Sequence, residues 1–254
     1  MDFITTASPT ILGKKTVAPI HLDPVLPYFE AVEKGPTIFS FSAPPRHGKS
    51  VLTNHFVARL MLRQPGIRIA YGSYGLDLSE NWFSGQVKNI FIANGIEINK
   101  DKNTRGEWEL LNGSSFKAIA PGTAFTGRGA DVTIVDDPYK DRQEAQSGGV
   151  RETTWNWIRD VVLTRRSPTA SVIVTHTRWH YEDIIGVLDR VNGYPFINMP
   201  AINELGEALW PEQFDIKKLA EIRKDLGEYS WASMYMGNPM PAGGAVFRGL
   251  NYYE

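Results

Sequence analysis

The stretch that decides the fold is "SAPPRHGKS", Ser42 to Ser50. It follows an apolar run, "TIFSFS", and precedes a helical pattern over residues 50–63. Except at its first position, where Ala43 replaces glycine, it matches the phosphate-binding loop, in which two glycines five residues apart precede Lys and Ser or Thr. A strand, this loop and a helix in that order predict a P-loop nucleoside triphosphatase. The alternative is a strand, turn and helix with a chance Gly-Lys-Ser.

The predicted loop has the chemistry to bind ATP. Its backbone N–H groups converge on the phosphates at the positive end of the helix, and Lys49 places a charge between the β- and γ-phosphates. We expect the hydroxyl of Ser50 to bind Mg²⁺. Arg46 either contacts phosphate or pairs with an acidic residue. The residues predicted to bind ATP are Ala43, Pro44, Pro45, Arg46, His47, Gly48, Lys49 and Ser50.

A second apolar run, "VTIVDDP", ends in two acidic residues. We expect Asp136 to hold Mg²⁺ together with Ser50, and Asp137 to orient or deprotonate the attacking water. Adjacent carboxylates repel each other, which a nearby cation offsets. Asp is shorter than the Glu commonly used as the base. The alternative is a capping or turn pair before Pro138.

A third apolar run, "SVIVTHTRWH", also ends in polar residues. In triphosphatases with an additional strand between the two phosphate motifs, the residue at the end of that strand senses the γ-phosphate. Thr175 is the first candidate, followed by Thr177 and His176. The 87 residues from Lys49 to Asp136 leave room for the additional strand. The sequence therefore predicts the additional-strand class of P-loop triphosphatases.

A glycine-flanked arginine, Arg128 in "TGRGAD", precedes the strand with the acidic pair. A flexible arginine beside a nucleotide site is typical of an arginine finger, which acts in its own subunit or on the γ-phosphate of a neighbouring one. The alternative is a surface turn with an incidental charge.

The rest of the chain alternates β-branched or aromatic runs with helical patterns, which indicates an α/β fold with a mostly parallel central sheet flanked by helices. We expect one domain over residues 1–240 and a Gly- and Pro-rich linker over 241–254. The predicted strands are residues 37–42, 68–73, 115–120, 132–137, 171–176 and 196–200, and the predicted helices are 50–63, 151–163, a helix after "RWHYED", and 215–236.

The composition is that of an ordinary globular protein. The 254 residues carry a formal net charge of −1 and no cysteine, which argues against a uniformly basic nucleic-acid-binding surface and favours a reducing compartment. No apolar run approaches the roughly 18 residues needed to span a bilayer, so we expect no membrane association.

Four stretches in the right order resemble the large subunit of the terminase, the DNA-packaging motor of tailed bacteriophages. They are "APPRHGKS", "AYGSYGLDLSE", "TGRGADVTIVDDPYKD" and "VTHTRWHYEDIIG", and the likeness extends over about Pro19 to Phe247. The resemblance implies an ATPase domain that moves double-stranded DNA through a portal protein into a procapsid. Two departures are Ala43, which many relatives share, and Asp137, where some branches have Glu.

The resemblance also implies roles for individual residues. Asp136 becomes the metal aspartate, Asp137 the catalytic acid, Thr175 to Arg178 the coupling motif, and Arg128 a finger acting on the neighbouring subunit. It implies a small terminase subunit as a partner, a homo-oligomeric ring on the portal, and a location in the host bacterial cytoplasm with transient docking on the procapsid. In this family a nuclease domain normally follows, and we expect no nuclease activity in this chain.

Two other functions fit the same motifs. One is a related DNA helicase or translocase, which would separate strands. The other is a nucleotide-gated module that docks on portal or DNA with little hydrolysis, because Asp137 is short.

Overall fold

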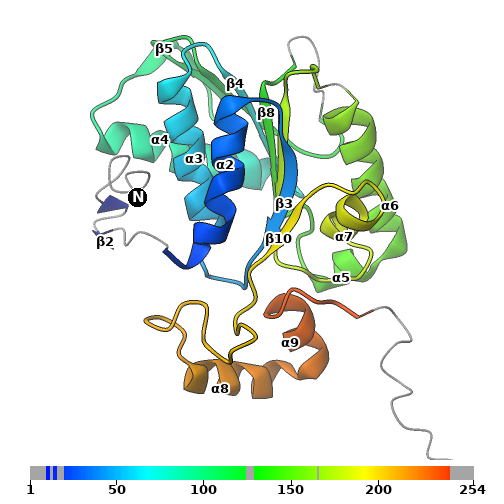
Figure 1. Cartoon of the computed structure of the whole chain (residues 1–254). Coiled ribbons are helices and arrows are strands. Elements are labelled where there is room, and N and C mark those ends of the chain that lie inside the picture. The colour runs from blue at the N-terminus through cyan, green and yellow to red at the C-terminus, as the bar shows by residue number, and fades with distance from the viewer. Residues whose placement is uncertain (1–9, 12–13, 16–19, 124–128, 165, 241–254) are drawn as a thin grey trace, which may run out of the picture.

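The computed structural model describes residues 10–11, 14–15, 20–123, 129–164 and 166–240. Its centre is an eight-stranded sheet with the order β10-β3-β9-β8-β4-β7-β6-β5 (Figure 1). The strands from β10 to β7 are parallel, and β6 and β5 extend the sheet with antiparallel pairing. The bounds are β3 Ile38–Ser42, β4 Arg68–Gly72, β5 Ile98–Asn103, β6 Glu107–Leu110, β7 Ser115–Ile119, β8 Val132–Asp136, β9 Ser171–Thr175 and β10 Phe196–Asn198; a separate two-stranded sheet pairs β1 Thr10–Ile11 with β2 Lys14–Lys15.

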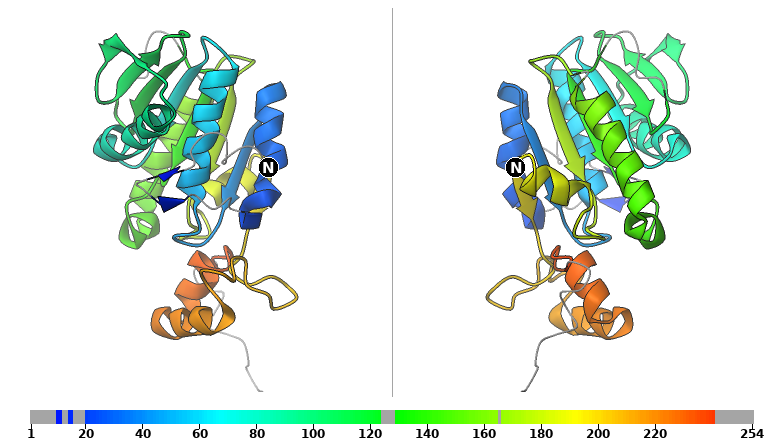
Figure 2. Two further views of the ribbon diagram at one scale, coloured as in Figure 1. Left: turned by 90° about the vertical axis from the view of Figure 1, so that its left-hand side faces the viewer. Right: turned by 90° about the vertical axis from the view of Figure 1, so that its right-hand side faces the viewer.

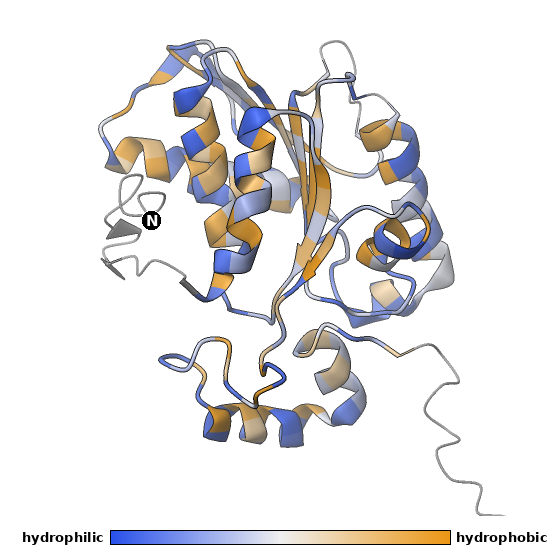
Figure 3. Cartoon of the chain, in the orientation of Figure 1, coloured by the Kyte–Doolittle hydropathy of each residue, from blue (hydrophilic) through white to orange (hydrophobic). Residues whose placement is uncertain are grey.

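The position of β9 confirms the predicted fold class. β9 lies between β3, which leads into the phosphate-binding loop, and β8, which ends in the acidic pair. Every residue of β8 and β9 is buried, as expected for strands covered by helices on both faces. Figure 3 shows these central strands as predominantly hydrophobic. All six strands predicted from the sequence are present, and the chain has the fold of a P-loop triphosphatase with the additional strand.

Helices cover both faces of the sheet (Figure 2). On one face the core contains aromatic and aliphatic residues from α2 Leu26–Lys34, α3 Lys49–Arg63 and α4 Ser84–Ala93. On the other face α6 Gly148–Trp157, continued by the π-helix η3 Ile158–Leu163, packs with α7 Ile184–Arg190. The shorter helices are the 3-10 helix η1 Ile20–Val25, the π-helix η2 Leu78–Phe83 and α5 Arg142–Gln146. Among the described residues, no helix combines the length and apolar character needed to cross a membrane.

A small helical unit follows β10 and lies beside the carboxyl ends of the strands (Figure 1). The predicted helical region over 215–236 forms two helices, α8 Ile216–Leu226 and α9 Glu228–Met234. Gly227, with a φ of 74°, separates them, because this left-handed conformation suits glycine and ends a helix. The unit has its own small core around Leu219 and Trp231.

Candidate active site

The predicted phosphate-binding loop connects β3 to α3. Ser42 ends β3, and Lys49 begins α3 directly after Gly48. The loop contains two left-handed residues, Gly48 with a φ of 85° and Arg46 with a φ of 62°. Glycine adopts this conformation freely, whereas for Arg46 it costs roughly 1 kcal/mol. The strained turn brings the positive end of α3 to the carboxyl edge of the sheet, where an anion is stabilised.

Lys49 is buried at the centre of the loop. Its ammonium donates hydrogen bonds to the carbonyls of Ala43 at 2.8 Å and Pro44 at 3.2 Å, and to the hydroxyl of Thr177 at 3.0 Å. Burial lowers the pKa of Lys49, and the carboxylates of Asp137 and Asp136 oppose that shift. The three acceptors satisfy the three N–H donors of an ammonium group and hold it at the loop.

Asp136 is fully buried at the end of β8. Its Oδ2 accepts a hydrogen bond from the Tyr71 hydroxyl at 2.9 Å, and its Oδ1 has no hydrogen-bond partner among the described residues. Burial and the neighbouring charge of Asp137 raise the pKa of Asp136 to about 7, although the hydroxyls of Ser50 and Tyr71 lower it. A buried carboxylate oxygen with no partner beside a serine hydroxyl is a donor set that fits Mg²⁺.

Asp137 has a left-handed backbone, with a φ of 48°. Two backbone hydrogen bonds hold it there: its N–H donates to the Thr175 carbonyl, and its carbonyl accepts from the Tyr74 N–H, both at 3.0 Å. Aspartate tolerates this region better than most residues. A strained residue held from two neighbouring segments indicates a functional position.

A cavity of about 480 Å³ joins these groups. The loop and α3 form one wall, and the segments after β4, β8 and β9 form the other, with Met234 contributed by α9. The lining residues are Pro45, Arg46, Gly48, Lys49, Ser50, Val51, Tyr74, Asp137, Tyr139, Lys140, Thr177, Trp179 and Met234. The structure therefore brings together the predicted loop and Asp137, with Asp136 and its Tyr71 partner beneath them.

The two threonines after β9 have different surroundings. Thr175 is fully buried, pairs with Asp136 in the sheet register, and leaves its hydroxyl without a partner among the described residues. Thr177 lines the cavity and contacts Lys49. Thr177, the second candidate from the sequence, is thus the one with direct contact to the loop, and γ-phosphate sensing by Thr175 stays a prediction. Arg128 lies outside the described residues.

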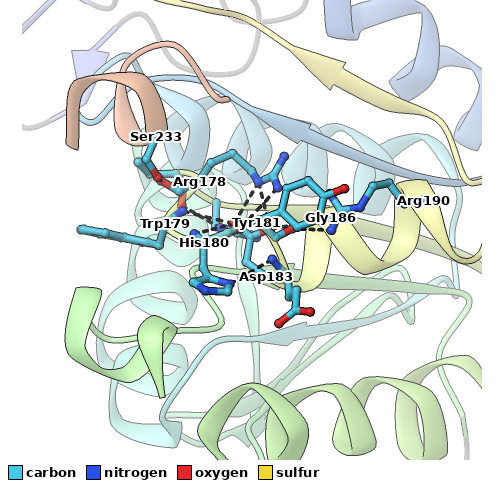
Figure 4. Close-up of polar contacts among 11 residues, drawn as sticks. Arg178, Trp179, His180, Tyr181, Asp183, Gly186, Arg190 and Ser233 are labelled. Atoms are coloured by element: carbon cyan, nitrogen blue, oxygen red, sulfur yellow. Dashed lines mark hydrogen bonds and ion pairs between the residues drawn. The ribbon is translucent and has the colours of Figure 1, made fainter. Parts of the chain in front are cut away.

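Asp183, which was not singled out from the sequence, organises the segment after Thr177. This fully buried carboxylate accepts hydrogen bonds from the Arg178 guanidinium at 2.9 Å and from the backbone N–H of Trp179 at 3.1 Å (Figure 4). It also caps α7 through the N–H of Gly186. Burial by itself raises the pKa of Asp183, but its charged and hydrogen-bonding partners lower it below the usual value. An acidic residue immediately before a helical pattern was the available signal.

The same segment contacts the helical unit. The hydroxyl of Ser233 in α9 donates to the Arg178 carbonyl at 2.9 Å (Figure 4). Arg178 therefore connects the Asp183 network to α9, and Thr177, one residue earlier, contacts Lys49. Contacts of Thr177 and Arg178 thus link the loop to the helical unit.

His47 forms a second connection to this unit. Its imidazole is fully buried and stacks on Phe214 with ring centroids 4.4 Å apart. Its Nδ1–H donates to the Pro45 carbonyl at 2.9 Å, and its Nε2 has no partner among the described residues. Burial lowers the pKa of His47 to about 4. The imidazole is therefore neutral at pH 7 and acts as a packing group within the loop.

Comparison with known proteins identifies the family of the chain. The chain matches the family model described as terminase large subunit, T4likevirus-type, N-terminal, over residues 40–252. This range includes every residue that the sequence analysis assigned to the site. A comparison with curated proteins finds no match.

Solved structures share the fold. The large terminase of bacteriophage HK97 has a TM-score of 0.65 at 14% identity, covering 94% of this chain and 54% of that one. A variant of the large terminase ATPase domain of Thermus phage P74-26 has a TM-score of 0.50 at 13% identity, covering 90% of this chain and 96% of that one. The large terminase of a thermophilic bacteriophage, in complex with ADP, has a TM-score of 0.51 at 8% identity, covering 82% of this chain and 49% of that one. The chain thus spans about half the length of the HK97 protein and of the ADP-bound protein.

Proposed function

The chain belongs to the family of large terminase subunits, and on this basis we propose that it is the ATP-hydrolysing motor domain that drives double-stranded viral DNA into the procapsid. One observation carries the proposal. The buried Lys49 ammonium links the phosphate-binding loop to Thr177 after the additional strand, and the acidic pair ends the adjacent strand. The contact between Lys49 and Thr177 links the proposed phosphate site to the segment that contacts α9 through Arg178 and Ser233.

The loop binds the phosphates of ATP through the backbone N–H groups at the start of α3 and through Lys49. Phosphate oxygens replace the present acceptors of Lys49, because charge-assisted hydrogen bonds to phosphate are stronger than those to neutral oxygens. This exchange releases the Thr177 hydroxyl. Because the Arg178 carbonyl accepts a hydrogen bond from Ser233 in α9, movement of the segment after Thr177 also moves α9.

Ser50 and Asp136 would hold Mg²⁺, and the bound cation would supply positive charge against the phosphates. Asp137 orients the attacking water and accepts its proton. Its backbone, fixed by Thr175 and Tyr74, keeps the carboxylate at the cavity although the side chain is shorter than a glutamate.

The family suggests the remaining partners. They are the portal protein, the small terminase subunit and further copies of this chain in a ring on the portal, in the host bacterial cytoplasm and transiently docked on the procapsid. In such a ring, Arg128 of one subunit completes the site of its neighbour and stabilises charge in the transition state. We further propose that residues 1–240 act as the motor domain.

ATP hydrolysis tests the proposal directly. We expect the chain to hydrolyse ATP in the presence of Mg²⁺, and Lys49→Ala to abolish the activity, because the lysine both binds and neutralises the phosphates. Lys102→Ala is the matched control, since Lys102 is exposed and pairs with Glu109 in the antiparallel part of the sheet. Near-normal turnover by folded Lys49→Ala would contradict the site assignment.

Two further measurements separate the alternatives. Unwinding of a forked DNA duplex would favour a helicase. ATP-dependent binding to portal or DNA with no turnover would favour a docking module.

A further inference from the structure

The hydroxyl of Tyr71 is placed to control the orientation of Asp136. Tyr71 lies in β4, which pairs directly with β8, and its register partner there is Ile134. Residues two apart on a strand point to the same face, so Asp136 is the diagonal neighbour of Tyr71 on that face. The long tyrosine side chain spans this diagonal, and its hydroxyl reaches Asp136 Oδ2 at 2.9 Å.

The ring of Tyr71 is held firmly. It is fully buried and stacks on Phe83, with ring centroids 4.6 Å apart and an interplanar angle of 21°. Phe116 lies tilted against it at 5.9 Å. An aromatic side chain packed in this way has little freedom, so the hydroxyl has a fixed position.

The hydrogen bond from Tyr71 gives the two carboxylate oxygens of Asp136 different surroundings. Oδ2 is occupied by Tyr71, whereas Oδ1 is buried and has no partner among the described residues. We propose that Tyr71 is a positioning residue that turns Asp136 so that Oδ1 faces the cation. The inference rests on the proposed function, in which Asp136 and Ser50 hold Mg²⁺.

The segment after Tyr71 supports the second carboxylate as well. Three residues later, the N–H of Tyr74 donates to the Asp137 carbonyl at 3.0 Å and helps to fix its left-handed backbone. The end of β4 thus holds Asp136 through a side chain and Asp137 through the main chain. β9 shares in holding Asp137, through the Thr175 carbonyl, but the side-chain hydrogen bond to Asp136 comes from β4.

Tyr71→Phe removes the hydroxyl and keeps the stacked ring. Groups that orient a metal ligand typically contribute 10- to 100-fold to metal affinity. We expect the dissociation constant for Mn²⁺, measured by electron paramagnetic resonance with ADP present, to rise about 10-fold. ADP affinity without metal and the melting temperature should stay close to those of the wild type. The Mg²⁺ concentration for half-maximal ATP hydrolysis should rise in parallel.

The control is Tyr28→Phe. This substitution removes a tyrosine hydroxyl from α2, where the ring packs on Phe39, and should leave Mn²⁺ binding unchanged. A second variant, Phe83→Leu, loosens the stack but keeps the Tyr71 hydroxyl, and should weaken Mn²⁺ binding less than Tyr71→Phe.

Wild-type Mn²⁺ affinity in Tyr71→Phe would overturn the inference, whether or not the melting temperature falls. In both cases the wild-type chain still binds ADP and Mn²⁺, so the proposed function stands. A wild-type chain that binds neither would refute the proposed function, and the role of Tyr71 with it.

Discussion

Protonation of His47 should destabilise the folded chain in mild acid, and His47→Asn should remove this effect. The Nδ1–H of His47 already donates to the Pro45 carbonyl, so a second proton must go to Nε2. That atom is buried and has no acceptor among the described residues, which agrees with the lowering of the pKa of His47 by burial to about 4. An unfolded chain has the ordinary histidine pKa of about 6.5.

The size and sign of the effect follow from these two pKa values. Between pH 6.5 and 4 the unfolded chain binds a proton that the folded chain does not, so the free energy of unfolding falls as the pH falls through this window. With a pKa lowered from 6.5 to about 4, the loss is about 2 kcal/mol at pH 5 and approaches about 3 kcal/mol below pH 4. Above about pH 7.5 the contribution of His47 is fully present.

The assay is urea unfolding of wild type and His47→Asn at pH 7.5 and pH 5. At pH 7.5 the substitution lowers the unfolding free energy, because the ring stacked on Phe214 is lost. At pH 5 that cost should shrink by about 2 kcal/mol, since the wild type alone has lost the contribution of His47. His180→Asn is the control, because His180 is only partly buried and should show a smaller change. A cost of His47→Asn that is equal at both pH values, or larger at pH 5, would refute the reasoning.

Three further predictions concern turnover. Asp137→Asn should bind ATP normally and lose roughly 10²- to 10⁴-fold in hydrolysis, because asparagine tolerates the left-handed backbone but cannot accept a proton; brisk hydrolysis by this variant would place the base elsewhere. The dilute chain should be a weak ATPase, since a finger supplied by a neighbour contributes about 10³- to 10⁵-fold. Arg128→Ala should therefore bind ATP with unchanged affinity, and mixing it with Asp137→Asn under motor-assembling conditions should restore some hydrolysis. No recovery, with an unchanged melting temperature of Arg128→Ala, would argue against action between subunits.

Much of the fold could be predicted because the central strands are short, apolar and buried on both faces. The apolar run of β8 predicts a strand even when its neighbouring strands in the sheet are unknown. β5 could not be found in this way, because "INKDKN" is polar and largely exposed and is a strand only by pairing with β6. The predicted helix over 215–236 missed the break at Gly227, since a single glycine is compatible with either a kink or an end.

The same difference, between local sequence pattern and contacts made only in the folded chain, applies to the candidate site. The loop residues and the acidic pair are contiguous in the sequence, and their local pattern specifies both their conformation and their chemistry. The role of Tyr71 has no local pattern, because it depends on a contact fixed by strand order. Asp183 has only the signal of an acidic residue before a helical pattern, and its contact with Arg178 depends on the packing of the loop. Tyr71 reaches Asp136 only because β4 is the strand that lies beside β8. A different neighbour for β8 would leave the same motif intact and change which residue orients the metal ligand, so relatives with this motif need not share the tyrosine.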